Sequence, residues 1–366
     1  MAYLVLDKLT KRFRRETVFE DLSLSAEPGE TIAVFGPSGA GKTVLLRLIA
    51  GVFDPEAGDI RLDGRSILHL PPEARDVGMA FQNFALYPHL DAFRNIASPL
   101  KAQGLGGEEV RRRVQAVAEL LKIDHVLTHL PKALSNGQKQ RTSLARSLVR
   151  EPKLLLLDDP LRNVDAKLRY EMRLELPRVL KQAGVTVLYV TQDYKEAMAL
   201  GDRVAVLTGG GIAQLDTPER IYKAPASREV AQLFGDPTIN LLPARPEPNG
   251  GGATVDIVGA SFPLPPLPEA ALGRDCLIGI RPEHIRVAME QREGALPAEL
   301  DAVTPLNVRS VLLLKTEDGG ELLASCPERE AERFPRGHRA VWIDIEASQL
   351  LVFDAASGAR LGGAAP

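Results

Sequence analysis

GPSGAGKT, Gly36 to Thr43, is the stretch of sequence that decides the fold of this chain. It matches the pattern G-x-x-x-x-G-K-[ST] at every fixed position, follows the strand-like TIAVF and precedes the helix-like KTVLLRLIAGV. A glycine-rich turn between a strand and a helix directs backbone N–H groups inward, and the helix N-terminus adds partial positive charge. The pattern therefore predicts a phosphate-binding loop in an α/β domain.

The side chains of this loop predict a nucleotide site. We expect Lys42 to reach the β- and γ-phosphates of a bound nucleotide and Thr43 to bind Mg²⁺. Asp158 ends the apolar run KLLLL and is the natural second partner of the ion. The alternatives are a chance glycine-rich turn and, for Asp158, a simple strand-end cap. From the loop and this strand, the residues expected to contact nucleotide are Gly36, Pro37, Ser38, Gly39, Ala40, Gly41, Lys42, Thr43 and Asp158.

The segments around the loop predict a parallel sheet and a helical insert. ETIAVFG, KLLLLDD and VTVLYVTQD are short and apolar throughout, which is typical of central strands covered on both faces. Between residues 84 and 150, valines and a leucine recur at helical spacing behind Glu108 and Glu109. RVAVLTGGGIAQLD predicts a hairpin, and Pro177 is expected to end or kink the helix that contains it.

The composition changes after Gly235, where a proline- and glycine-rich connection leads to short β-like runs separated by turn residues. This pattern predicts a small β-barrel. We therefore expect a nucleotide-binding domain over residues 1–235, with a helical subdomain at about 84–150, and a β-barrel domain over residues 236–366.

Composition and charge restrict the class of function. Of the 366 residues 45% are hydrophobic and 25% are charged, and the net charge is −3, which gives no electrostatic argument for binding nucleic acid. No apolar run approaches the ~18 residues needed to cross a bilayer, and the N-terminus does not have the pattern of a signal peptide. Cys276 and Cys326 form no metal pattern and suggest a reducing cytosol. A membrane role would have to go through a partner.

The segment LSNGQKQRTSLARSLVREPKLLLLDDP distinguishes among nucleotide-binding proteins. Ser135 and Gln138 fit a capping box that opens a long helix, and a serine beside a glycine at a helix N-terminus is a second anion site. One γ-phosphate does not need two such sites in one chain. Two chains that face each other need both sites, because the second site of each chain closes the nucleotide site of the other.

On these motifs the sequence resembles the ATP-binding-cassette (ABC) ATPases, specifically the ATPase subunits of sugar and polyol importers of the maltose-importer type. GPSGAGKT resembles the Walker A loop, KLLLLDD the Walker B strand and LSNGQ the LSGGQ signature. Gln82 stands at the Q-loop, Asp165 in the D-loop and Gln192 in the switch segment. Phe13 stands where an aromatic stacks on adenine, although it also fits an ordinary apolar strand end. GIRPEHI resembles a motif of the C-terminal regulatory barrel.

The resemblance implies an α/β P-loop NTPase with a RecA-like core and a helical subdomain, followed by an OB-like (TOBE) barrel. It implies ATP and Mg²⁺ as cofactors, with Thr43, Gln82 and Asp158 around the metal. It also implies two transmembrane permease subunits, a second ATPase subunit and an extracytoplasmic solute-binding protein as partners. The chain would then lie peripherally on the cytoplasmic face of the membrane and serve import of a carbohydrate or polyol, glycerol-type import included.

Three residues depart from the family pattern at the site. Asp159 stands in place of the glutamate after Walker B, Gln192 in place of the switch histidine and Asn136 in place of the first signature glycine. Aspartate is one methylene shorter than glutamate, and glutamine cannot carry the proton or charge that histidine carries. Asn136 we interpret as mild, because asparagine tolerates left-handed backbone angles. Arg162 replaces a small serine usual in the D-loop.

These departures lead to an asymmetric hypothesis. The chain's own site would be impaired in hydrolysis, and Ser135, Asn136, Gly137, Gln138 and Asp165 would act in trans on the intact site of a different ATPase subunit. The alternatives are a homodimer that hydrolyses ATP slowly through Asp159, and a regulatory, ATP-binding subunit without productive hydrolysis.

Overall fold

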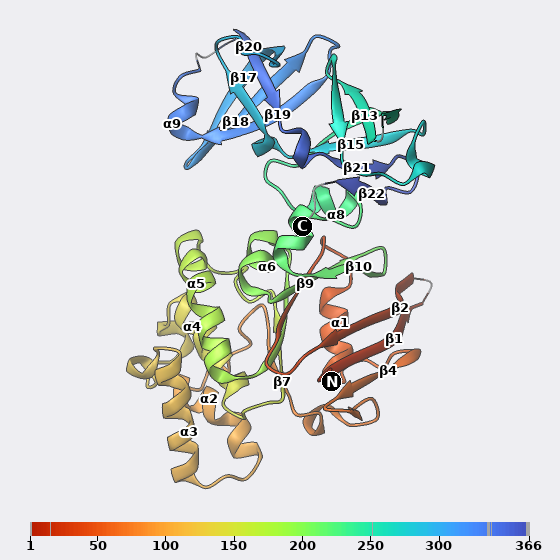
Figure 1. Cartoon of the computed structure of the whole chain (residues 1–366). Coiled ribbons are helices and arrows are strands. Elements are labelled where there is room, and N and C mark those ends of the chain that lie inside the picture. Colours follow the sequence, from red (N-terminus) through yellow and green to blue (C-terminus); the bar gives the residue numbers. More distant parts are fainter. Residues whose placement is uncertain (1, 15, 251, 335–336, 338, 364–366) are drawn as a thin grey trace. The chain divides into compact units, whose positions relative to one another are not determined.

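The computed structural model describes residues 2–14, 16–250, 252–334, 337 and 339–363 (Figure 1). The chain divides into two compact units, the first ending at Pro218 and the second beginning at Glu219. The first holds the phosphate loop and the helical insert. The second consists mainly of strands.

The centre of the first unit is a six-stranded sheet in the order β10-β9-β3-β8-β7-β6. All neighbours in it are parallel except β10, which pairs antiparallel with β9 across the expected glycine hairpin. The bounds of these strands are β3 Thr31–Phe35, β6 Val77–Ala80, β7 Leu154–Asp158, β8 Thr186–Thr191, β9 Arg203–Thr208 and β10 Gly211–Asp216. The three strands expected from apolar runs are thus confirmed as β3, β7 and β8.

The apolar runs are explained by the two faces of the sheet. Leu155 and Leu157 of β7 face a core formed with the helical insert. Leu154 and Leu156 face a second core, formed with α1 (Lys42–Ile49) and an antiparallel sheet in the order β2-β1-β4-β5. Since successive side chains of a strand point to opposite faces, both faces need apolar residues. The strands of the antiparallel sheet are β1 Leu4–Phe13, β2 Glu16–Ala26, β4 Ala57–Leu62 and β5 Arg65–Ser66.

The first unit also contains the following helices. The expected helical insert contains α2 (Ala92–Ala102), α3 (Gly107–Leu120) and α4 (Asn136–Leu148). α5 (Ala166–Ala183) follows β7, and α6 (Tyr194–Leu200) follows β8.

The expectation that Pro177 ends its helix is wrong, because α5 continues for six residues beyond it. Met172, Leu176 and Leu180 bury one face on both sides of the proline, and this packing outweighs the lost backbone bond.

Two short helices lie at the start of the second unit: α7 (Pro218–Lys223), whose first residue is the last of the first unit, and α8 (Arg228–Leu233). Three antiparallel sheets follow, in the orders β11-β15-β21-β22, β12-β13-β14 and β16-β20-β17-β18-β19. They enclose an apolar core, and a smaller apolar cluster joins Leu351 and Phe353 of β21 to Ala231 of α8. Their bounds are β11 Asn240–Ala244, β12 Glu247–Asn249, β13 Gly252–Ile257, β14 Ala260–Leu264, β15 Cys276–Ile280, β16 Ile285–Ala288, β17 Leu296–Leu306, β18 Arg309–Thr316, β19 Glu321–Pro327, β20 Arg339–Ile345, β21 Leu351–Asp354 and β22 Arg360–Gly363; a short helix, α9 (Glu328–Ala331), lies between β19 and β20.

Within the described part of the chain, no helix is both long enough and apolar enough to span a bilayer. Cys276 and Cys326 are both free thiols.

Candidate nucleotide-binding site

The parallel register brings three loops to one edge of the sheet. Val190 of β8 lies opposite both Asp158 of β7 and Val34 of β3, so these strands end almost level. The loop at Gly36, the Asp159 loop and the Gln192 loop therefore leave the sheet side by side. The carboxyl ends of parallel strands are where α/β sheets bind ligands.

The loop from Gly36 to Thr43 has the geometry that its glycines predict. Gly39 and Gly41 have φ angles of 85° and 93°, in the left-handed region that favours glycine. A Cβ at Gly41 would lie 2.8 Å from the Phe19 ring, so a larger residue does not fit there. Lys42 Nζ donates to the carbonyls of Gly36 at 2.8 Å and Pro37 at 2.7 Å. The ammonium group thus lies over the loop on which phosphates would bind.

Thr43 and Asp158 form the expected metal pair. The Thr43 hydroxyl donates to Asp158 Oδ1 at 3.0 Å, although the two residues are 115 positions apart. Burial raises the pKa of the Asp158 carboxyl, and the Thr43 hydroxyl, Arg47 and Lys42 oppose that rise. A hydroxyl beside one carboxylate is the donor set that Mg²⁺ uses when phosphate oxygens and water complete its shell. These residues fit the ion, which would shield the phosphate charge when bound.

Asp159 follows β7 in an uncommon backbone conformation, with a φ of 45°. Its N–H donates to the Val190 carbonyl at 2.9 Å, and its side chain lies 3.8 Å from the Arg162 guanidinium. Burial raises the pKa of the Asp159 carboxyl, and Arg162 opposes the rise most strongly. The carboxylate is therefore held inside the site.

A cavity of about 330 Å³ joins these groups. Its described lining combines the loop, the metal pair, Gln82 and three departures from the family pattern (Asp159, Arg162 and Gln192): Ser38, Gly39, Gly41, Lys42, Thr43, Val44, Gln82, Asp158, Asp159, Arg162, Val190 and Gln192. The structure thus brings together most of the residues that the sequence proposed for one nucleotide. Their roles in binding stay predictions.

Phe13 does not belong to the described lining of this cavity. It lies at the end of β1, about one-third exposed, with its ring edge-on to Phe53 at 5.4 Å between centroids. Lys11 Nζ lies 5.0 Å from the Phe13 centroid. An exposed ring can stack on a base, so the proposed adenine contact stays a prediction.

The signature residues open α4 with the expected capping box. Ser135 Oγ accepts from the Gln138 N–H at 3.3 Å, and the Gln138 side chain accepts from the Ser135 N–H at 2.9 Å. Asn136 lies in the first turn of α4 and needs no left-handed angle, so the expectation that it serves to tolerate such an angle is wrong. A Cβ at Gly137 would come within 2.4 Å of Leu168 Cδ2, so α4 packs closely on α5 there. Asp165 caps α5 by accepting from the Leu168 N–H at 3.0 Å.

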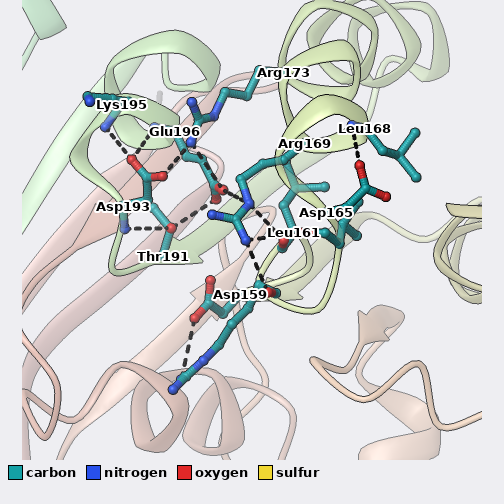
Figure 2. A network of polar contacts seen from close by, with 12 residues as sticks. Asp159, Leu161, Asp165, Leu168, Arg169, Arg173, Thr191, Asp193, Lys195 and Glu196 are labelled. Carbon is teal, nitrogen blue, oxygen red and sulfur yellow. Dashed lines mark hydrogen bonds and ion pairs between the residues drawn. The ribbon is translucent and has the colours of Figure 1, made fainter. Parts of the chain in front are cut away.

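Sequence reasoning missed a buried polar network behind the site (Figure 2). Glu196 of α6 accepts from the hydroxyls of Tyr189 and Thr191, both at 2.9 Å. Arg173 Nη2 and Arg169 Nε of α5 lie 3.7 and 4.0 Å from its carboxylate. Arg173 also pairs with Asp193, which caps α6. The signal that could have revealed the network was two arginines four residues apart, on one face of the helix after the D-loop.

Arg169 connects this network to the loop after Asp159. Its side chain donates to the carbonyls of Leu161, Arg162 and Val164 at 3.1 to 3.2 Å. Figure 2 shows Arg169 between Glu196 on one side and the Leu161 loop on the other. The D-loop and the switch helix are therefore held by the same arginine.

Glu196→Ala should destabilise the first unit by about 3 kcal/mol, because it leaves Arg173 partly buried without one of its carboxylates and two buried hydroxyls without an acceptor. Differential scanning calorimetry measures the loss. Glu171→Ala, at an exposed position of α5, is the matched control and should change stability by less than about 0.5 kcal/mol. Equal effects of the two variants would show that the network does not stabilise the fold.

Comparisons with known proteins agree with this architecture. The family described as ABC transporter matches residues 19–162, the MalK OB fold domain matches residues 235–285, and the TOBE domain matches residues 278–353. These matches confirm the predicted fold class, a P-loop NTPase domain followed by OB-like β domains. The domain boundary expected at residue 235 stays a prediction.

Curated relatives match over nearly the whole chain. The sn-glycerol-3-phosphate import ATP-binding protein UgpC of Escherichia coli is 39% identical over 362 residues, which are 99% of this chain and 100% of that protein. UgpC of Chromobacterium violaceum is 39% identical over 372 residues, covering 100% and 98%. UgpC of Chromohalobacter salexigens is 44% identical over 310 residues, covering 84% and 82%. This chain therefore belongs to the ABC transporter family of ATP-binding proteins with MalK-type OB and TOBE domains.

Proposed function

We propose that the chain is the ATP-binding subunit of an ABC importer and lies peripherally on the cytoplasmic face of the membrane. The observation that carries the proposal is the Thr43 to Asp158 hydrogen bond beside a complete phosphate loop. It occurs in a chain that aligns over 99% of its length with an import ATP-binding protein. Lys42 would bind the β- and γ-phosphates of ATP, and Thr43, Asp158 and Gln82 would lie around Mg²⁺.

The proposed substrate is sn-glycerol-3-phosphate or a related sugar or polyol, because the curated relatives carry that substrate in their names. The proposed partners are two transmembrane permease subunits, a second ATPase subunit and an extracytoplasmic solute-binding protein. Substrate choice would lie in the membrane and solute-binding subunits.

The transport proposal is tested with the transporter purified from its source membranes through a tag on this chain. Reconstituted vesicles supplied with the solute-binding protein should take up labelled sn-glycerol-3-phosphate when ATP is available to this subunit. Matched vesicles given ADP should not. Parallel assays with maltose and glycerol test the substrate class, and uptake that does not depend on ATP would contradict the proposal.

We further propose that this chain's own site hydrolyses ATP slowly, while its signature closes the site of a different ATPase subunit. Two substitutions at the residues that would handle the attacking water support this, Asp159 and Gln192, and both line the nucleotide cavity. A displacement of about 1 Å at a reacting centre can cost ~10²-fold in rate. The capped signature helix, by contrast, keeps Ser135, Gly137 and Gln138 in regular geometry.

Native mass spectrometry of the same purified transporter tests the asymmetry. One copy of this chain beside one different ATPase subunit is the expected result. Two copies of this chain would favour a homodimer in which Asp159 serves both sites. A transporter that lacks ATP hydrolysis altogether would favour a regulatory, ATP-binding role.

A further inference from the structure

Arg162 lies inside the nucleotide cavity, although it belongs to the loop after β7 and not to the phosphate loop. Its backbone N–H donates to the Asp159 carbonyl at 3.3 Å, which closes a tight turn. Its own carbonyl accepts from Arg169 at 3.2 Å, so the turn is held from behind as well. The backbone at Arg162 is thus held in place in the lining of the cavity.

The Arg162 side chain extends to Asp159 and is partly exposed to solvent. Nη1 lies 3.8 Å from Asp159 Oδ2, and both residues line the cavity together with Lys42 and Thr43. The Arg162 side chain is 52% exposed. A half-exposed guanidinium can turn from Asp159 to a ligand with little cost in desolvation.

The balance of charges in the lining of the cavity depends on Arg162. Two carboxylates, Asp158 and Asp159, and two cations, Lys42 and Arg162, make its described lining neutral. ATP with Mg²⁺ brings about two negative charges, and Gln192 offers no charge to meet them. Without Arg162 the lining would carry a net negative charge and would repel the terminal phosphate.

We propose that Arg162 binds the γ-phosphate of the nucleotide held by the phosphate loop of its own chain, and so distinguishes ATP from ADP. The proposal rests on the proposed function, that ATP binds at this site. A guanidinium presents several N–H groups in a planar fork, which matches phosphate oxygens better than a point charge does. It supplies a cation to the same lining that contains the uncharged Gln192.

The experiment is isothermal titration calorimetry of the full chain with Mg²⁺, using ADP and the non-hydrolysable analogue AMP-PNP. Arg162→Gln should weaken AMP-PNP binding about tenfold, which one charge-assisted hydrogen bond accounts for, and leave ADP binding within about twofold. Arg162→Lys should recover part of the loss. Arg178→Gln, at an exposed position of α5 outside the cavity, is the matched control and should change neither affinity.

The comparison of the two nucleotides separates the proposal from a structural role. Equal losses for AMP-PNP and ADP would overturn it, because an arginine that only holds Asp159 or the turn would affect both. Unchanged affinities in Arg162→Gln would overturn it too. If the wild-type chain bound neither nucleotide, the proposed function itself would fail, and this inference with it.

Discussion

Asp159→Glu combined with Gln192→His should raise the ATP turnover of the assembled transporter by about 10²-fold. Glutamate adds one methylene and extends the carboxylate into the cavity toward the position of an attacking water. Histidine adds a side chain that can carry a proton or a positive charge beside the γ-phosphate. A well-placed general base contributes ~10² to 10⁴-fold, so restoring the pair should give an effect of that order.

The backbone conformation at position 159 should reduce the expected gain in turnover. Its φ of 45° lies in the left-handed region, where aspartate is tolerated better than glutamate. The cost of placing glutamate there is of order 1 kcal/mol, about fivefold in an equilibrium, which is smaller than the expected gain in rate. Steady-state phosphate release by the reconstituted transporter measures the result.

The matched control for this pair is Asp159→Asn with Gln192→His, which supplies the histidine without a carboxylate. Its turnover should stay at or below that of the wild type. If the glutamate-histidine variant were no faster than the wild type, positions 159 and 192 would not limit the rate, and the account of an impaired site would be refuted.

Lys42→Ala should weaken binding of ATP to this chain by about 10³-fold. The substitution removes the cation that would contact two phosphates, and contacts to charged groups contribute about 1.5 to 3 kcal/mol each. It also leaves the carbonyls of Gly36 and Pro37 without the donor that they have now. ADP binding should fall by less, since ADP lacks the γ-phosphate.

Lys153→Ala is the control for Lys42→Ala, because Lys153 precedes the opposite end of β7 and pairs with Asp63 at 2.8 Å. It should leave nucleotide affinity unchanged in the same calorimetric titration. In the assembled transporter, some hydrolysis should survive Lys42→Ala if a different subunit holds the active site. Complete loss would instead indicate that this chain provides both sites.

The parts of the fold that the sequence predicted are those fixed by local chemistry. The runs at β7 and β8 are apolar at every position because two separate cores need them, and this pattern is visible in one dimension. The phosphate loop and the capping box at Ser135 are each formed by residues that lie within eight positions of one another in the sequence. Such motifs determine their own geometry, which is why both are found as expected.

The rest depends on contacts between distant segments. Pro177 lies within a continuous helix because of side chains packed on both sides of it, and no rule for an isolated helix predicts that outcome. Glu196 is polar in a short helix and looks like a solvent-facing residue until β8 and α5 surround it. In the sequence Arg162 is visible only as a departure from the family pattern, whereas its place in the cavity follows from the turn at Asp159.

The contact between Gly137 and Leu168 has a consequence for exchanging parts between related chains. The first turn of α4 packs closely on the first turn of α5 there, so a Cβ at Gly137 would require the Leu168 side chain to shift. A chimera that takes its signature from one parent and its D-loop from another would inherit two surfaces that were never fitted together. The signature and the D-loop therefore pack as one unit. A graft should transfer residues 135–138 and 165–168 together.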